Sequence, residues 1–329
     1  MEQANRHYYA HHQPFGSKGD FITAPDISHL FGEMVAVWLI ERWQDLGEPS
    51  RVYLLEAGPG RGTLMADILR TSQVSPAFAA ALSVHLLENS PQLSICQQQT
   101  LAPHGSVPQQ WHGDLHTVPT DAPLLFVANE FLDALPVEQA IWQHGGWQQR
   151  LIQARHGGTL SYTYRPLSEP LPLLPASAPE GSIYEYAPLR LAYAAQLHER
   201  LRTQGGAGLW IDYGDYTPAT HRLGDTLQAL RHHHPASPLE NAGEADLTAH
   251  VDFFALAHQA ETFGLTCHFC LQRDFLFACG MQERLTAVLK KTIDPNARHT
   301  LLNGYQRLVG LDQMGVLFKI LAIAAEKDT

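Results

Sequence analysis

The sequence predicts an α/β fold in which short apolar strands alternate with helices along a doubly wound parallel sheet. The expected strands cover 52–57, 83–88 and 123–130. Helix-patterned segments lie between these apolar runs, which is typical of parallel strands buried on both faces. The first run also leads through three glycines directly into a helix, an arrangement with which α/β folds bind ligands.

Helices and an antiparallel region follow these strands. Helical spacing of apolar residues predicts a helix over 28–46, for which Ser28 is a candidate N-cap. After Pro136, alternating stretches separated by His-Gly-Gly predict an antiparallel meander inserted into the connectivity of the sheet. The other expected elements are helices over 63–70, from about Pro91, over 185–204 and over 250–263, strands over 207–214, 265–278 and 315–324, a surface connection over 166–179 and a loop-rich stretch over 214–249.

We expect a single domain over residues 1–329, a length sufficient for a sizeable buried core. Its expected parts are an N-terminal lid and helix over 1–49, a cofactor-binding core over 50–136, the meander and its linker over 137–180, and the rest of the sheet with substrate-side loops over 181–329.

Composition and charge narrow the class of protein. The formal net charge of −11 argues against a nucleic-acid partner, because nucleic-acid binders present a basic face to phosphates. No uninterrupted apolar run reaches about 18 residues, so we expect no membrane partner. Four cysteines in this length do not make a disulfide scaffold. We therefore expect a reducing compartment, namely the bacterial cytoplasm, or the mitochondrial matrix if a presequence is missing from this chain.

The stretch Glu56-Ala-Gly58-Pro-Gly60-Arg-Gly62 limits which ligand the turn after the first strand can accept. A P-loop requires a lysine after the glycines, and none follows here. The dinucleotide fingerprint requires a glycine at position 63 or 65, where this chain has threonine and methionine. The spacing that remains is the one seen in S-adenosylmethionine-dependent methyltransferases. A tight turn without a ligand is the alternative.

Acidic residues near this turn suit S-adenosylmethionine. The cofactor carries a sulfonium and an ammonium group, so Glu56 offers charge of the right sign, while the glycines allow close backbone approach. Glu88, at the end of the second strand, is placed to accept hydrogen bonds from ribose hydroxyls. Asp114, about one element later, is a candidate contact for the adenine amino group.

Seven stretches spread over almost the whole chain resemble the MidA-like family of S-adenosylmethionine-dependent methyltransferases. They are PFGSKGDFITAPDISHLFGEM (14–34), LLEAGPGRGTLMADILR (54–70), ANEFLDALPVEQ (128–139), IDYGD (211–215), GDTLQALRHH (224–233), GEADLTAHVDF (243–253) and MGVLFKILAI (314–323). The resemblance implies a Rossmann-like methyltransferase fold with an inserted antiparallel meander and helical additions. Mitochondrial members of this family assist assembly of respiratory complex I by methylating an arginine of a core subunit. The resemblance therefore implies a protein substrate with an arginine acceptor, and a complex I-type subunit as a candidate partner.

Polar residues after the third strand are candidates for acceptor binding and catalysis. Carboxylates hold a guanidinium bidentately, and Asn129, Glu130 and Asp133 follow that strand at the ligand edge of the sheet. Asn129 is a candidate contact to the cofactor or the acceptor. A helical turn here would place Glu130 and Asp133 on one side. The alternative is a helix N-terminus whose acids favour the helix dipole.

Asp212 and His250 complete the candidate catalytic set. Asp212 lies near the end of a later strand, followed by Tyr213 as a candidate pocket wall. His250 is a candidate proton acceptor, although a single histidine is more often structural. The sequence from Asp246 to Thr248 resembles a helix cap, so a plain helix start is the alternative in that region.

The segment before the helix at 28–46 is a candidate lid over the cofactor, by resemblance to the family. Phe21 could shelter the sulfonium through a cation–π contact. Gly19, Asp20 and Thr23 are the other lid candidates, and an ordinary loop is the alternative.

Two signals that suggest metal binding are discounted. Cys267 and Cys270 lack a second pair at zinc spacing. The His-rich stretch over 231–235 has no adjacent acidic partner. We therefore predict no metal site.

Two rival functions stay open. The chain could be a cofactor-binding assembly factor that acts as a chaperone with little turnover, and alanine at Glu130, Asp133 and Asp212 separates this reading from catalysis. It could also methylate a small molecule, for which a closed buried pocket is expected, whereas an open acidic groove favours a protein. A homodimer is an open alternative to a monomer.

Overall fold

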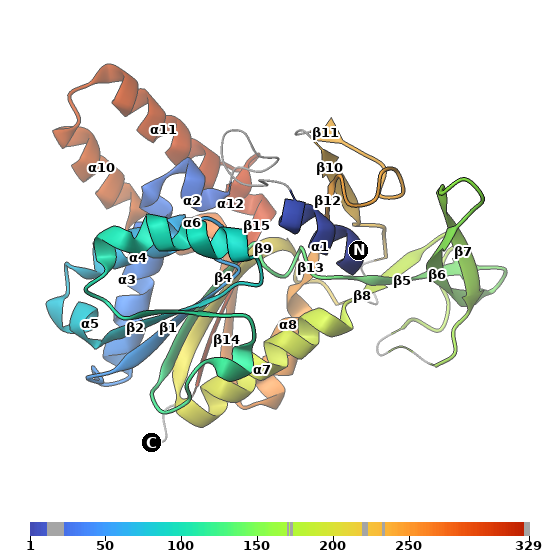
Figure 1. The fold of residues 1–329 in the computed structure, drawn as a ribbon, viewed down its shortest axis with the longest axis horizontal. Coiled ribbons are helices and arrows are strands. Elements are labelled where there is room, and N and C mark those ends of the chain that lie inside the picture. Colours follow the sequence, from blue (N-terminus) through green and yellow to red (C-terminus); the bar gives the residue numbers. More distant parts are fainter. Residues whose placement is uncertain (12–22, 170, 172–173, 219–222, 232–233, 326–329) are drawn as a thin grey trace.

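A computed structural model describes residues 1–329 except 12–22, 170, 172–173, 219–222, 232–233 and 326–329. Its centre is an eight-stranded sheet (Figure 1). The strands of this sheet are β1 (Val52–Ala57), β2 (Leu82–Leu87), β3 (Gln109–His112), β4 (Leu124–Asn129), β9 (Gly206–Asp215), β13 (Val251–Asp252), β14 (Leu265–Leu271) and β15 (Phe318–Ala325). Their order is β14-β15-β9-β4-β1-β2-β3, and β13 pairs with the end of β9.

Helices cover both faces of this sheet, which confirms the predicted doubly wound α/β fold (Figure 1). One face carries α3 (His29–Asp45), α4 (Thr63–Ser72), α5 (Pro76–Ala81) and α6 (Pro91–Leu101), and the other carries α7 (Pro188–Gln204) and α8 (Phe253–Thr262). The strands from β9 to β3 run parallel, whereas β15 runs antiparallel to both of its neighbours. Because β1 is buried throughout, its side chains alternate between two apolar cores.

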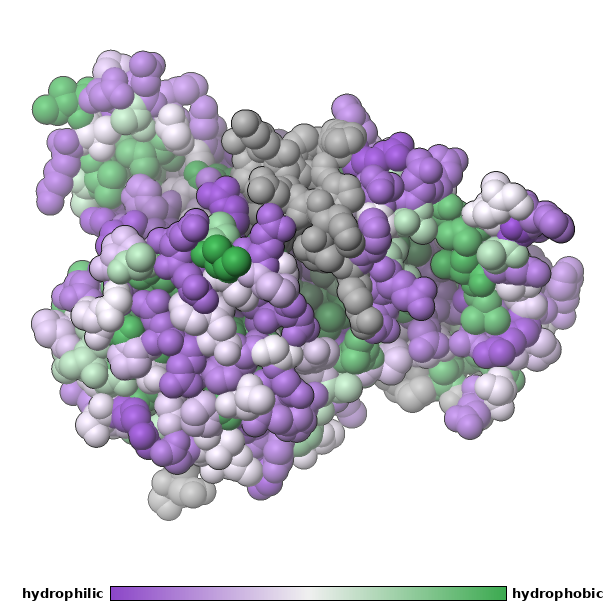
Figure 2. Space-filling model, viewed as in Figure 1, coloured by the Kyte–Doolittle hydropathy of each residue, from purple (hydrophilic) through white to green (hydrophobic). Residues whose placement is uncertain are grey.

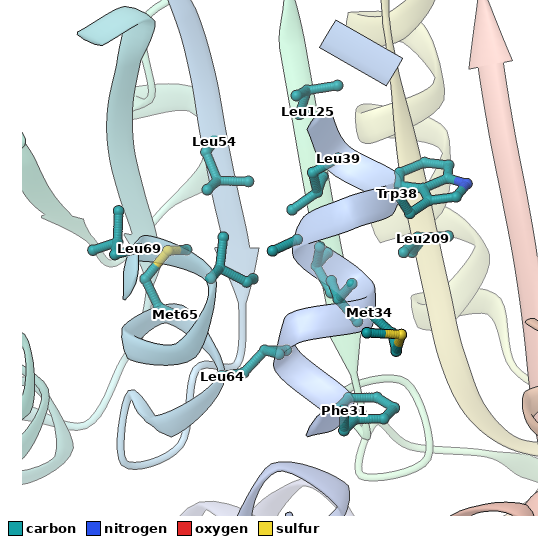
Figure 3. Close-up of a cluster of buried hydrophobic side chains, with 14 of the residues drawn as sticks. Phe31, Met34, Trp38, Leu39, Leu54, Leu64, Met65, Leu69, Leu125 and Leu209 are labelled. Atoms are coloured by element: carbon teal, nitrogen blue, oxygen red, sulfur yellow. The ribbon is translucent and has the colours of Figure 1, made fainter. Parts of the chain in front are cut away.

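The larger core lies between the sheet and the helix pair α3 and α4. Figure 3 shows α3 between two groups of buried side chains: Leu64 and Met65 of α4 lie on one side, and Phe31, Met34 and Trp38 of α3 extend to the other side, toward Leu209 of β9. The predicted helix over 28–46 and its cap are confirmed, since Ser28 Oγ accepts a hydrogen bond from the Leu30 N–H at 3.3 Å. This packing fixes the strand ends that carry the candidate site.

Two smaller antiparallel sheets extend the fold. The predicted meander forms β5 (Glu138–Gln143), β6 (Gly146–Ala154) and β7 (Leu160–Pro166), and it makes a separate sheet with an unpredicted strand, β8 (Ile183–Tyr186). The stretch expected to be loop-rich contains β10 (Gln228–Arg231), β11 (His234–Pro235) and β12 (Asp246–Thr248). The helix-cap reading of that last segment was wrong: it is a buried strand, and Asp252 caps α8 instead by accepting from the Ala255 N–H at 3.0 Å.

The C-terminal third differs most from the prediction. The strand expected over 265–278 ends at Leu271 and continues as the helix α9 (Gln272–Ala278), because its last residues bury Phe275 and Leu276 on one helical face. The structure adds α10 (Met281–Lys291) and α11 (Pro295–Val309), a helical hairpin, and α12 (Met314–Leu317) before β15. The short elements elsewhere are α1 (Glu2–His11), α2 (Ala24–Ile27) and the 3-10 turns η1 (Ala102–His104) and η2 (Leu115–Thr117).

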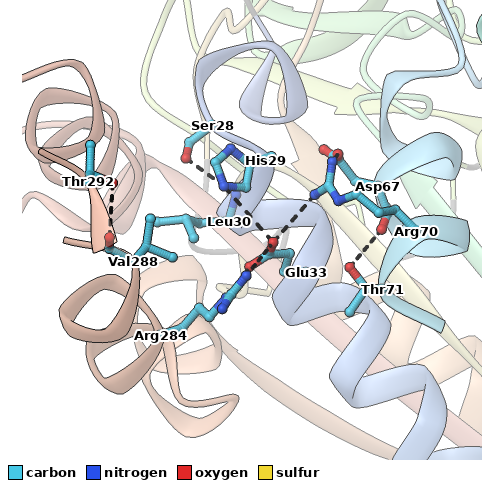
Figure 4. A network of polar contacts seen from close by, with 10 residues as sticks. All are labelled: Ser28, His29, Leu30, Glu33, Asp67, Arg70, Thr71, Arg284, Val288 and Thr292. Carbon is cyan, nitrogen blue, oxygen red and sulfur yellow. Dashed lines mark hydrogen bonds and ion pairs between the residues drawn. The ribbon is translucent and has the colours of Figure 1, made fainter. Parts of the chain in front are cut away.

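A buried carboxylate ties three helices of one face together. Figure 4 shows Glu33 of α3 between Arg284 of α10 and Arg70 of α4. Arg284 donates from Nε and Nη2 at 2.6 and 3.0 Å, and Arg70 donates from Nη2 at 3.4 Å. Since Glu33 is only 5% exposed, this network anchors the base of the helical hairpin to the core.

The outer surface agrees with the composition. On the face shown in Figure 2, hydrophilic residues predominate and apolar residues lie in small groups. Among the described residues, no helix has both the length and the apolarity needed to cross a membrane. All four cysteines are free.

The register of the sheet brings the candidate residues to one edge. Ala57 pairs with Leu87 and with Ala128, and Asn129 pairs with Ile211. The residues that follow these strands therefore lie in one row at the carboxyl ends of parallel strands, where open α/β sheets bind ligands.

Candidate active site

Three glycines shape the turn between β1 and α4. Gly58, Gly60 and Gly62 have φ of 66°, 52° and 80°, a left-handed conformation that favours glycine. A Cβ atom on Gly58 would also lie 2.8 Å from Cδ2 of Phe131. The backbone thus passes close to the residues after β4 with no side chain in between.

A cavity of about 650 Å³ opens beside this turn. One wall follows β1 and β2 and includes Gly58, Gly60 and Glu88. Much of the remaining lining is apolar and comes from the segment after β4, from α7 and from α1. Its members are Phe131, Ala134, Leu135, Pro136, Leu189, Tyr193 and Asn5, with the carboxylates Glu130 and Glu2. We call this space the main cavity.

A second space of about 50 Å³, the small cavity, shares Gly58, Gly60 and Glu130 with the main cavity. Its other lining residues are Thr23, Pro25, Asp26, Glu56, Pro59, Arg61, Thr63, Leu64 and Asn129. The glycine turn therefore borders two adjoining spaces.

Two buried acceptor atoms at the small cavity have no hydrogen-bond partner among the described residues. They are Oε2 of Glu56, whose side chain is almost fully buried, and Oδ1 of Asn129. Burial raises the pKa of Glu56 to about 8. An acceptor oxygen in such a position is costly unless a ligand donates to it.

Glu88 lies at the end of β2, as the sequence predicts, and lines the main cavity. Its Oε1 accepts from the Ser90 N–H at 2.7 Å, and its Oε2 accepts from Gln97 Nε2 at 3.0 Å. Burial raises the pKa of Glu88. Gln97 lies in α6 within a run of three glutamines, and no pattern in the sequence marks it as part of a site.

Glu130 follows β4 with φ of 52°, a strained conformation for a residue other than glycine. Its N–H donates to the carbonyl oxygen of Ile211 at 2.9 Å, which holds the backbone in place. Burial, and then the neighbouring Asp133, raises the pKa of Glu130 to about 8. Glu130 is thus an acidic side chain that lines both cavities.

The segment after Glu130 is an irregular turn, so both helical readings of it were wrong. Asp212 explains why: its Oδ2 accepts from the N–H groups of Leu132 and Asp133, each at 3.1 Å, and its Oδ1 accepts from the Tyr213 N–H at 3.0 Å. The carboxylate therefore organises the turn, and Asp212 lines neither cavity. Burial raises the pKa of Asp212 well above its usual range.

Asp133 also lines neither cavity. It is 5% exposed and hydrogen-bonds the Tyr213 side chain, while burial raises its pKa. Beneath it lies the buried Arg190, which sequence reasoning missed. The Arg190 guanidinium donates to the carbonyl oxygens of Asp133, Leu135, Ala249 and His250 at 2.7–3.2 Å. Asp133 and Arg190 thus support the turn from inside.

Other predicted site residues lie away from the cavities. The His250 ring meets Tyr213 edge-on at 5.6 Å, and the backbone N–H of His250 donates to Thr226 Oγ1 at 3.0 Å. Asp114 caps η2 by accepting from the His116 N–H at 2.9 Å. Neither His250 nor Asp114 lines a cavity, so their proposed roles stay predictions.

Of the candidate lid, only Thr23 is described, and it borders the small cavity. Gly19, Asp20 and Phe21 lie outside the described residues, as does part of the His-rich stretch over 231–235. Within the described part of the chain, no group of three or more histidine, cysteine or acidic side chains could hold a metal ion.

Comparison with known proteins decides the family. A family described as "Putative S-adenosyl-L-methionine-dependent methyltransferase" matches residues 34–270 of this chain. The chain belongs to this methyltransferase family. It is an enzyme that uses S-adenosyl-L-methionine as its methyl donor.

Named relatives span nearly the whole methyltransferase. The protein arginine methyltransferase NDUFAF7 of Rattus norvegicus mitochondria is 34% identical over 96% of this chain and 77% of its own length. The Drosophila melanogaster homologue is 36% identical with the same coverage. A crystal structure of a "likely methyl transferase" from Burkholderia thailandensis, bound to S-adenosyl-homocysteine, is 26% identical, has a TM-score of 0.83, and covers 98% of this chain and 86% of that one.

The cavities of the methyltransferase fit its cofactor. S-adenosylmethionine brings an ammonium group, and the unpartnered oxygens of Glu56 and Asn129 at the small cavity are acceptors of the kind that such a group requires. The main cavity adds the Glu88 carboxylate, which suits hydroxyl donors, and a volume typical of small-molecule sites.

Proposed function

We propose that this methyltransferase methylates a guanidinium nitrogen of an arginine in a protein. The observation that carries the proposal is Glu130, a strained acidic residue where an apolar wall and both cavities meet. A carboxylate there can bind a guanidinium through two parallel hydrogen bonds. The apolar wall with Phe131 and Tyr193, whose rings meet edge-on at 5.7 Å, suits the aliphatic stem of arginine. The relatives named protein arginine methyltransferases support the same acceptor.

The cavity residues that we propose to contact the cofactor have distinct roles. Glu56 and Asn129 accept from the ammonium group, and Glu88 accepts from the ribose hydroxyls. The glycines 58, 60 and 62 let the backbone approach the ligand. When bound, S-adenosylmethionine supplies an electrophilic methyl carbon on its sulfonium.

The protein must also align the guanidinium with the methyl carbon and remove a proton from the reacting nitrogen. Glu130 holds the guanidinium so that one nitrogen faces the methyl carbon, and the apolar wall excludes water. The carbon–sulfur bond to the methyl group would break, its electron pair staying on sulfur as a neutral thioether, and the nitrogen that gains the methyl group must lose one proton. Glu130 accepts the proton, and a pKa near 8 without ligand suits a group that exchanges protons at neutral pH. Asp133, Asp212 and Arg190 act on this step only by holding the turn.

Glu130→Gln tests the proposal, because it keeps the shape of the side chain and removes its charge. We expect kcat/KM for an arginine peptide to fall by about 100-fold or more, while the Kd of S-adenosylmethionine stays within about threefold. Radiolabel transfer and calorimetry measure the two quantities, and mass spectrometry of the product identifies the methylated residue. Unchanged turnover, or methyl transfer to another residue type, would contradict the proposal.

The same variant separates enzyme from chaperone. Glu130→Gln leaves the Asp212 hydrogen bonds intact, whereas changes at Asp133 or Asp212 also loosen the turn. If a deletion strain regains assembly of its respiratory complex with the variant, the chaperone reading is correct. The family resemblance favours a complex I-type subunit as the target, in the bacterial cytoplasm or the mitochondrial matrix. A small-molecule acceptor and a homodimer stay as alternatives that methylated-protein profiling and sedimentation test.

A further inference from the structure

Gln97 of α6 is a fully buried amide that lines neither cavity yet contacts two groups that do. Its Nε2 donates to the Gly60 carbonyl oxygen at 2.8 Å and to Glu88 Oε2 at 3.0 Å. Its Oε1 accepts from Trp111 Nε1 at 2.9 Å. Both donor hydrogens and the acceptor oxygen are therefore engaged.

Trp111 decides which way this amide points. An indole N–H can only donate, so the Gln97 oxygen must face Trp111 and the nitrogen must face the cavity side. The reversed amide would bring a nitrogen against the indole N–H and an oxygen against Glu88. One orientation is thus strongly favoured, and it presents two donors to the cofactor wall.

Close backbone packing keeps α6 against the glycine turn. Gly62 has φ of 80°, and a Cβ atom there would lie 3.4 Å from the Cα of Gln97. The Gln97 backbone therefore lies within van der Waals contact of the turn, and its side chain reaches the Gly60 carbonyl oxygen. Through that side chain, the carbonyl of Gly60 and the carboxylate of Glu88 are fixed relative to each other.

We infer that Gln97 is a positioning residue for cofactor binding, which sets the affinity for S-adenosylmethionine without touching it. It aims the Glu88 carboxylate at the main cavity and holds the glycine turn at the distance that the ligand requires. The inference rests on the proposed role of Glu88 in binding the ribose.

Two substitutions and a matched control test this inference in the full-length protein. Gln97→Met keeps the length and removes all three hydrogen bonds. Gln97→Glu removes the donors and places a carboxylate beside Glu88. Gln98→Glu makes the same charge change at an exposed position one residue further along α6.

We expect both Gln97 variants to raise the Kd and KM of S-adenosylmethionine by about 10- to 100-fold, with kcat at saturating cofactor within about threefold. Gln98→Glu should change neither value by more than about twofold. The Gln97→Glu defect should be larger at pH 8.5 than at pH 6, because a protonated carboxyl can still donate one hydrogen bond. A purely structural role would lower thermal stability without this dependence on pH.

The outcomes separate this inference from the assignment of Glu88. If Glu88→Gln leaves the Kd unchanged, the proposed ribose contact is wrong. If Glu88→Gln weakens binding and Gln97→Met does not, only the role of Gln97 is wrong. Should Gln97→Met fail to fold, Trp111→Phe gives the same test, since it removes the donor that orients the amide; unchanged affinity in that variant would overturn the inference.

Discussion

Glu56 and Glu130 are carboxyl groups whose folded environment opposes ionisation near neutral pH. Burial is the main cause at both positions, and each pKa rises to about 8. A cation bound beside them would favour the ionised forms. Cofactor and acceptor binding should therefore release protons, and stability and ligand affinity are linked through these residues.

We expect the free energy of unfolding of the ligand-free protein to decrease as the pH rises from 7 to 8. Between the ordinary value of 4.5 and about 8, the folded state holds protons on Glu56 and Glu130 that the unfolded state has lost, so raising the pH favours unfolding. Each group contributes a slope of about 1 kcal/mol per pH unit. Urea denaturation at several pH values measures the decrease.

Histidines act with the opposite sign below this range. Burial lowers the pKa of His85 and of His198 to about 4, whereas the unfolded imidazoles keep an ordinary value of 6.5, so the stability that these groups add with rising pH is almost complete at pH 7. The variants Glu56→Gln and Glu130→Gln should each flatten the slope. A stability that is constant or rises from pH 7 to 8, with the same slope in both variants, would show that these carboxyls are already ionised in the folded protein.

The positions of single residues could be predicted at the ends of strands. Glu56 near the end of β1, and Glu88 and Glu130 directly after β2 and β4, were expected to share one edge because these strands have clear apolar patterns and parallel strands share a carboxyl edge. Gln97 and Arg190 could not be found, because they act from helices and meet the site only through tertiary packing. Their sequence neighbourhoods resemble any amphipathic helix.

At the scale of elements, local sequence pattern predicts β14, whereas tertiary packing decides α9. The alternation from Leu265 to Leu271 predicts a strand correctly, but the apolar residues that follow can satisfy either a strand or a helix. The packing of Phe275 and Leu276 selects the helix. The local pattern was also insufficient for β8, a four-residue strand that pairs with β5.

The Glu33 network that joins α3, α4 and α10 should make a measurable contribution to the free energy of unfolding. We expect Glu33→Gln to lower the free energy of unfolding by about 1–3 kcal/mol, because it weakens the charge-assisted hydrogen bonds of a buried carboxylate with Arg284 and Arg70. Urea denaturation with an unchanged m-value measures the loss. Glu41→Gln, at an exposed position of the same helix, serves as control and should cost less than about 0.5 kcal/mol. Equal losses in both variants would mean that the network adds nothing beyond surface charge.

At the scale of the whole molecule, the α/β architecture followed from the sequence because strand and helix periodicities are local properties. The meander was also foreseen, yet its formation of a separate sheet with β8 depends on a contact across some forty residues of chain. The single-domain division over 1–329 stays a prediction. What the sequence alone could not supply is the orientation of side chains at the shared edge.

The negative charge of the chain and of the main cavity should affect how cationic peptides bind. The chain carries a formal charge of −11, and Glu130 and Glu2 line the main cavity. A cationic peptide should therefore be attracted over a distance that salt screens. We expect the KM of a lysine-flanked arginine peptide to rise about five- to tenfold between 0.02 and 0.5 M NaCl. Replacing the flanking lysines by glutamine should reduce that rise to about twofold, because only the long-range attraction is lost while the proposed arginine contact with Glu130 remains. Steady-state methyl transfer at saturating S-adenosylmethionine gives both values, and the same salt response for the two peptides would show that acceptor binding depends on local contacts alone.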